Sequence, residues 1–146
     1  MSLHAAPVKL PAAVEIRPGT PYHPNHWDTC PTLARQRIYD AIYNEAREAA
    51  IAACKDMPDG GACGFAWVVF RPATHPFIRH MKATGRGSAH YAGGWQFWNP
   101  GEYRGQSIDA IEAGATAFAK VLQSYWPERN SGARQEPLIY AGSRLD

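Results

Sequence analysis

The chain is poor in the features that mark several large protein classes. Its 146 residues include only three cysteines, Cys30, Cys54 and Cys63, with no paired spacing. An odd number of scattered cysteines argues against the disulfide framework of a small secreted domain. No run approaches the ~18 apolar residues that cross a membrane, and the first residues lack a signal-peptide core. We therefore expect a cytoplasmic protein with no membrane partner.

Acidic residues are missing from one long stretch, residues 60–101. The same stretch carries four Lys or Arg and three His, although the net charge of the whole chain is only +2. A net charge this small does not by itself indicate nucleic-acid binding. The stretch predicts either a surface that faces an anion or a solvated face without acids, and the sequence leaves both open.

Motifs for metal binding and catalysis are also sparse. The close histidine pair His23 and His26 lies in a proline-rich segment, so we expect no metal site. Cys63 is a candidate nucleophile with a histidine such as His90 as its base, but no spacing holds the two together. The glycines of residues 86–107 match neither a phosphate loop nor a dinucleotide-binding motif. We expect no cofactor and favour a protein without enzymatic activity.

Proline divides the chain into two parts. Six prolines between residues 7 and 31 predict an extended N-terminal arm, residues 1–31, and residues 32–146 predict a single α/β domain. Apolar and aromatic residues within the arm favour an arm that lies along a surface of its own domain or of a neighbouring subunit. A disordered tail is the alternative for residues 1–15. We expect a homo-oligomer formed through the arm.

Hydrophobic periodicity predicts six elements after the arm. Helices are expected over 32–55, between Thr74 as N-cap and Gly85, and from the N-cap Ser107 to about residue 126. Strands are expected at 65–70, 91–98 and 138–140, followed by a tail. The order predicts an α/β or α+β fold in which a small three-stranded sheet packs with three helices.

Two details of these elements carry structural predictions. Strand 65–70 is apolar on both faces, so we expect it to be central and covered on both sides. Gly114 lies inside the last helix, where glycine is unfavourable, and this predicts the close approach of another backbone.

The loop-rich stretch 86–107 is the most distinctive segment of the chain. Its glycines permit close approach of a ligand, its rings can stack on a planar group, and the helix start at Ser107 offers N–H groups to an anion. This combination predicts a site for a small anionic or nucleotide-like ligand. The predicted contacts, the first two as electrostatic support, are Arg79, Lys82, Arg86, His90, Trp98, Arg104 and Ser107. The alternative is a bulged hairpin edge whose rings belong to the core.

Four segments resemble a group of small uncharacterised proteins encoded by tailed phages and prophages. They are Cys63–Val68, Gln96–Pro100 with its WNP sequence, Asp109–Ala115 and the closing Ala141–Asp146, which reads AGSRLD. The resemblance covers about residues 32–146 and brings no activity and no catalytic residue with it. It implies a phage or prophage origin, action in the cytoplasm of a host cell, and a role against host defence or in infection.

The leading hypothesis is a non-enzymatic binding protein for a small anionic or nucleotide-like ligand. One alternative is an interaction or inhibitor module that docks on a host protein. Another is a small hydrolase or transferase that uses His90 or Cys63. Nucleic acid is a less favoured partner, because four Lys or Arg over residues 60–101 are few for tracking a phosphate backbone.

Overall fold

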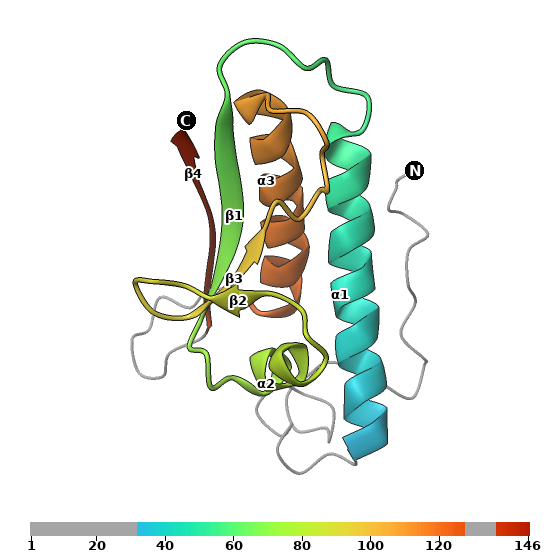
Figure 1. Ribbon diagram of the computed structural model, residues 1–146. Helices are drawn as coiled ribbons and strands as arrows, with labels where there is room; N and C mark the ends of the chain where they lie inside the picture. Colours follow the sequence, from blue (N-terminus) through green and yellow to red (C-terminus); the bar gives the residue numbers. More distant parts are fainter. Residues whose placement is uncertain (1–31, 128–136) are drawn as a thin grey trace.

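A computed structural model describes residues 32–127 and 137–146 of the chain (Figure 1). Within these ranges the helices are α1 (Thr32–Cys54), α2 (Pro76–Ala83) and α3 (Ile108–Tyr125). The strands are β1 (Gly64–Arg71), β2 (Ser88–Ala89), β3 (Trp95–Trp98) and β4 (Leu138–Leu145). The predicted mixed α/β class is confirmed, but the sheet has four strands instead of the three expected.

The four strands form one antiparallel sheet in the order β2-β3-β1-β4. From β1 onward the chain runs β-α-β-β-α-β. This chain order and this strand order are those of the split β-α-β arrangement, to which α1 is added at the N-terminal side. The central place predicted for strand 65–70 is confirmed.

Helices α1 and α3 lie side by side on one face of the sheet (Figure 1). Side chains alternate along a strand, so Ala66, Val68 and Phe70 of β1 point toward the helices and are buried. From β3, Phe97 joins them and lies with its ring centroid 5.1 Å from that of Phe118. The expected cover on both sides of strand 65–70 is uneven in the described residues: the helices all pack on one face, whereas on the other face Val69 is buried beside Gly94 of the hairpin loop and its neighbours stay partly exposed.

The close approach predicted at Gly114 is confirmed. A Cβ at this position would lie 3.1 Å from Cα of Gly101 and 3.5 Å from the carbonyl oxygen of Ala50. Small residues therefore let α1, α3 and the loop after β3 pack with their backbones nearly in contact.

The structure differs from the predictions at several element ends. The N-cap of α2 is His75 instead of Thr74, and its Nδ1 accepts a hydrogen bond from the N–H of Phe77. The expected strand 91–98 is shorter, because Gly93 and Gly94 have φ angles of 103° and 92° and form a hairpin loop. The expected tail belongs to β4, which pairs with the whole of β1 from Gly64↔Leu145 to Arg71↔Leu138.

None of the helices in the described part of the chain is both long enough and apolar enough to cross a membrane. The predicted arm, residues 1–31, and the homo-oligomer that we expect through it fall outside the described residues. Both therefore stay predictions.

Candidate functional site on the open sheet face

The face of the sheet turned away from α1 and α3, here called the open face, carries no helix within the described residues. The antiparallel registers and the alternation of side chains assign eleven residues to it. They are Phe65, Trp67, Val69, Arg71, Ser88, Gln96, Trp98, Leu138, Tyr140, Gly142 and Arg144. This set contains two arginines and no acid. The acid-free stretch of the sequence thus supplies both central strands of a basic, ring-bearing surface.

Five rings on and beside the open face form a continuous series, here called the aromatic row: Tyr91, His90, Trp67, Trp98 and Phe65. The centroids of successive rings lie 4.6, 6.4, 5.4 and 5.6 Å apart. The indoles of Trp67 and Trp98 are parallel within 1°. Large rings normally seek burial, yet the exposed fractions are 49% for Trp98 and 93% for Tyr91. The row therefore offers flat apolar surface to the solvent.

The register of the sheet brings the two indoles together. Trp98 of β3 lies directly opposite Trp67 of β1, so both side chains rise from the same face. On the other side, Trp67 faces Gly142 of β4. A Cβ on Gly142 would lie 2.8 Å from the indole nitrogen of Trp67. The glycine thus leaves the room that the Trp67 ring occupies over β4.

The hairpin loop 90–94 closes one end of the row. His90 is buried, and its Nδ1 accepts a hydrogen bond of 3.2 Å from the N–H of Ala92. The backbone N–H of His90 donates to the carbonyl of Gly94, and Nε of Arg71 donates to the carbonyl of Gly93. These bonds hold the loop against β1, so Tyr91 at its tip extends the row.

Two arginines lie beside the rings. The guanidinium carbon of Arg144 is 5.3 Å from the centroid of the Phe65 ring, and that of Arg71 is 5.7 Å from the Tyr140 ring. Arg71 also donates to the hydroxyl of Tyr140 at 3.2 Å. In the described residues neither arginine forms an ion pair with an acid. A guanidinium stacked on a ring keeps N–H groups at its edge with which it can bind an anion.

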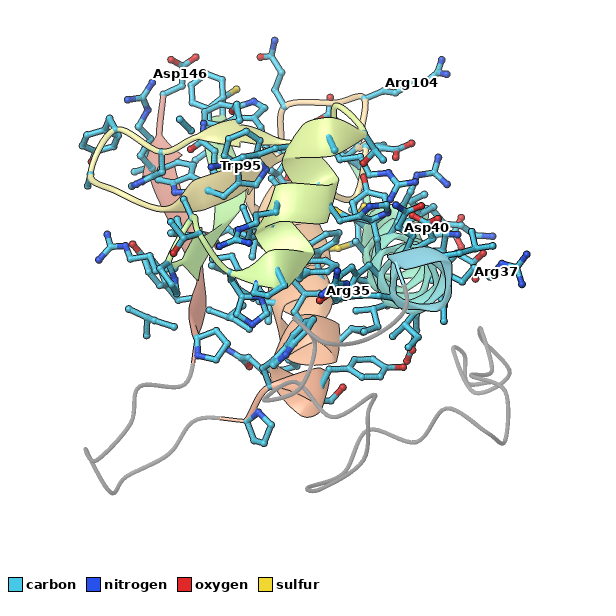
Figure 2. The ribbon with its side chains drawn as sticks, turned by 90° about the horizontal axis from the view of Figure 1, so that it is seen from below. Arg35, Arg37, Asp40, Trp95, Arg104 and Asp146 are labelled. Atoms are coloured by element: carbon cyan, nitrogen blue, oxygen red, sulfur yellow. The ribbon has the colours of Figure 1, made fainter. Side chains whose placement is uncertain are left out.

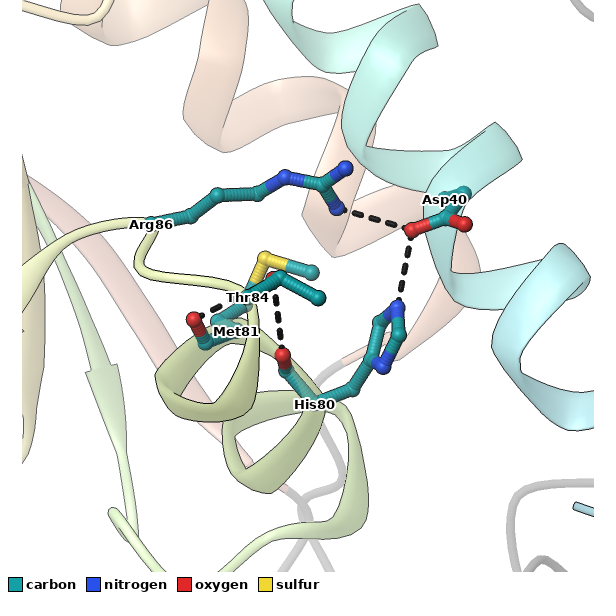
Figure 3. A network of polar contacts seen from close by, with 5 residues as sticks. All are labelled: Asp40, His80, Met81, Thr84 and Arg86. Atoms are coloured by element: carbon teal, nitrogen blue, oxygen red, sulfur yellow. Dashed lines mark hydrogen bonds and ion pairs between the residues drawn. The ribbon is translucent and has the colours of Figure 1, made fainter.

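The seven residues predicted as ligand contacts are not brought together in one place. Trp98 and His90 belong to the aromatic row, but Arg86 lies on the helix side of the sheet. Its Nη1 is 2.8 Å from Oδ1 of Asp40, and the same oxygen is 2.8 Å from Nε2 of His80 (Figure 3). The guanidinium of Arg86 also lies 4.7 Å over the Tyr43 ring. Arg86 thus ties the end of α2 to α1.

The electrostatics of this cluster agree with a structural role. Partial burial by itself raises the pKa of Asp40, but the hydrogen bonds and charges of His80 and Arg86 outweigh it and leave that pKa lowered. The carboxylate therefore stays ionised and holds the guanidinium of Arg86 and the imidazole of His80 in place.

The other predicted cations also lie away from the open face. Arg79 is exposed on α2, in a hollow that it shares with Arg35 and His80. Lys82 places its Nζ 5.3 Å from the centroid of the Trp95 ring, on the helix side of β3. Arg104 extends outward into solvent, away from Trp95 (Figure 2).

A carboxylate of the chain itself, that of Asp59, already binds the N–H groups at the start of α3. Ser107 is the N-cap as predicted, but its side chain makes no capping hydrogen bond. Instead, the N–H groups of Gln106 and Ser107 donate to Oδ1 of Asp59 at 2.8 and 2.9 Å. Asp59 lies 48 residues before Ser107, so no local pattern points to this contact.

A hollow of about 200 Å³ adjoins the Phe65 end of the aromatic row. Cys63, Trp98, Ile111 and Asp146 all line it, so each of the four segments on which the predicted phage resemblance rests contributes to it. Asn99 also lines it, with its Nδ2 donating to the carbonyl of Tyr103 and its buried Oδ1 accepting no hydrogen bond. No hydrogen bond links Cys63 to His90, the pair considered for nucleophilic catalysis.

A wider groove of about 640 Å³ lies between α1 and α3. Alanines of the two helices line it together with Glu48 and Lys120. It offers no ring on which a planar ligand could stack. Within residues 32–127 and 137–146, no three His, Cys, Asp or Glu side chains gather as a group able to hold a metal ion.

Comparison of the chain with protein-family models, with curated proteins and with solved structures finds no match in any of the three. The resemblance to phage proteins therefore stays a prediction, and the function is argued from the site alone. The site residues that sequence reasoning missed are Phe65, Trp67, Arg71 and Arg144. The alternation along β1 carries the signal for Phe65, Trp67 and Arg71, but no local pattern indicates the pairing with β4 that adds Arg144.

Proposed function

We propose that this protein is a non-enzymatic binding protein that holds a nucleotide-like anionic ligand on its open face. The observation that carries the proposal is the pair of parallel indoles, Trp67 and the half-exposed Trp98, in one row with Phe65 and beside Arg144. An aromatic face binds a nucleobase by stacking, and an arginine beside it binds phosphate.

The arrangement suits binding better than chemistry. The groups that face the ligand are rings, guanidinium groups, the amide of Gln96 and the hydroxyl of Ser88. This hydroxyl accepts a hydrogen bond from Gln96, and no base is bonded to it among the described residues. One of the originally predicted contacts, Trp98, keeps this role in the proposal, whereas the buried His90 supports the loop that carries Tyr91. Arg71 and Arg144 take the place of the predicted cationic contacts, which lie away from the open face, and Phe65 adds a ring.

A thermal-shift assay of the full chain with a panel of nucleoside mono- and triphosphates and cyclic dinucleotides tests the proposal. We expect at least one of them to raise the melting temperature and to quench tryptophan fluorescence. We also expect chromatography to recover that nucleotide unchanged, because the described residues of the site include no nucleophile hydrogen-bonded to a base. Trp98→Ala should abolish both signals by removing the exposed stacking face.

Leu33→Ala is the matched control, because Leu33 is another exposed large apolar side chain and lies at the start of α1. It should leave binding unchanged. The proposal fails if no nucleotide shifts the wild-type protein, or if Trp98→Ala binds as well as the wild type does.

A further inference from the structure

The aromatic row is longer than one nucleobase requires. It draws its rings from the hairpin loop, from β3 and from β1, and its five rings follow one another in contact. Four of the five reach the solvent fully or in part, and the buried His90 links Tyr91 to the other three. A base covers one ring or one ring pair, so a single nucleotide would leave most of the row uncovered. Single strands, in contrast, place successive bases on successive aromatic side chains.

The two arginines of the open face are far apart. Arg71 pairs with Leu138 and Arg144 pairs with Phe65, so they lie six residues apart along β1. At a rise of ~3.3 Å per strand residue this separation is about 20 Å. One phosphate group cannot contact both side chains, whereas a backbone with repeating phosphates can.

The charge of the face favours the same kind of ligand. Its eleven assigned residues include two arginines and no acid. A four-stranded antiparallel sheet with helices on one face and exposed rings on the other is also a geometry that serves single-stranded RNA in known modules. Stacking on the rings requires unpaired bases, so a duplex does not fit this surface.

We infer that the ligand of the open face is a single-stranded nucleic acid, with bases stacked along the aromatic row and phosphates bound by Arg144 and Arg71. The inference rests on the proposed function, because it names the class of nucleotide ligand. It also makes nucleic acid a favoured partner, which the sequence alone did not, because the tertiary structure brings together rings and cations that are far apart in the sequence.

Fluorescence anisotropy of the full chain with labelled single strands of about eight nucleotides tests the inference. DNA and RNA strands and the corresponding duplex are measured beside unlabelled mononucleotides as competitors. We expect single strands to bind at least tenfold more tightly than any mononucleotide or the duplex. Loss of one stacking contact in Trp98→Ala should weaken single-strand binding about tenfold.

Arg144→Gln and Arg104→Gln form a matched pair, because both remove one exposed positive charge. Only Arg144→Gln should weaken binding, and it should reduce the slope of log affinity against log salt by about 0.7, the value for one phosphate contact on a single strand. Equal effects of the two variants would mean non-specific attraction and would overturn the inference.

The remaining outcomes separate the inference from the proposed function. A mononucleotide that binds as tightly as the oligonucleotides would overturn the inference and leave the proposed function intact. A duplex that binds as tightly as the single strand would also overturn it. Failure of both mononucleotides and oligonucleotides to bind would remove the inference and the proposed function together.

Discussion

Gly101 and Gly114 meet backbone to backbone, with no side chain between them. A Cβ on Gly101 would lie 3.2 Å from Cα of Gly114, 3.0 Å from the carbonyl oxygen of Ala50 and 2.7 Å from Sγ of Cys54. Through this contact the loop after β3, which contains Gly101, packs against both α1 and α3. The contact holds the loop that leads from β3, which carries Trp98, to the start of α3.

Gly101→Ala should therefore destabilise the protein. The added methyl group has no space beside Cys54 and Ala50, and overpacking of this kind costs about 1–3 kcal/mol. Urea unfolding measures the change in the free energy of unfolding. Gly60→Ala is the control, because a Cβ there meets nothing within 4 Å and the change should stay within about 1 kcal/mol of zero. Equal stabilities of the two variants would contradict the packing described for Gly101.

Gly142→Ala should disturb the indole pair without unfolding the protein. Its Cβ would press on the Trp67 ring, which must then tilt away from Trp98. We expect a smaller exciton signal of the Trp67–Trp98 pair in far-ultraviolet circular dichroism and weaker ligand binding. Trp98→Phe removes one indole and shows how much of the signal belongs to the pair. A full signal in Gly142→Ala would mean that the glycine does not position Trp67.

His75 should make stability depend on pH. Burial, with a smaller contribution from Arg79, lowers the pKa of His75 from 6.5 to about 3. The unfolded chain takes up this proton below pH 6.5 and the folded protein does not, so stability falls as the pH drops from 6.5 toward about 3. One such proton contributes about 1.4 kcal/mol per pH unit.

His75→Asn should remove this dependence, because asparagine can still cap α2 but does not titrate. Urea unfolding across the same pH range compares the two proteins, and the slope of the variant should be smaller by one proton. The stability that the lowered pKa of Asp40 contributes is lost only as the pH falls below about 3.8, so the upper part of the window belongs to His75. Parallel curves for the two proteins would show that His75 is protonated in the folded state.

Arg86→Lys should lower stability and leave ligand binding unchanged. Lysine cannot reproduce both the hydrogen bond to Asp40 and the stacking on Tyr43. Because Asp40 is partly exposed, we expect a loss of about 1 kcal/mol. Asp40→Asn should cost a similar amount, and the double variant should cost less than the sum of the two. Weaker ligand binding at unchanged stability would instead return Arg86 to the ligand site.

Local patterns in the sequence were enough to predict α1, β1 and α3, because their apolar residues repeat with the period of the element. The same reasoning predicted the close approach at Gly114. It could not find β2, or the length of β4, since Ser88, Ala89 and residues 141–145 have weak strand propensity. These residues become strands because β3 and β1 offer them hydrogen-bonding partners.

The candidate site shows the same division. Spacing along the chain assigns Trp67 and Trp98 each to one side of its own strand, because side chains in a strand alternate, whereas Arg144 lies beyond the strand predicted at 138–140. That the three residues share one face depends on which strands are neighbours and in which register, and these pairings join residues up to 81 positions apart. Such pairings follow from the burial of one sheet face under α1 and α3, which leaves the other face and its rings available to a ligand.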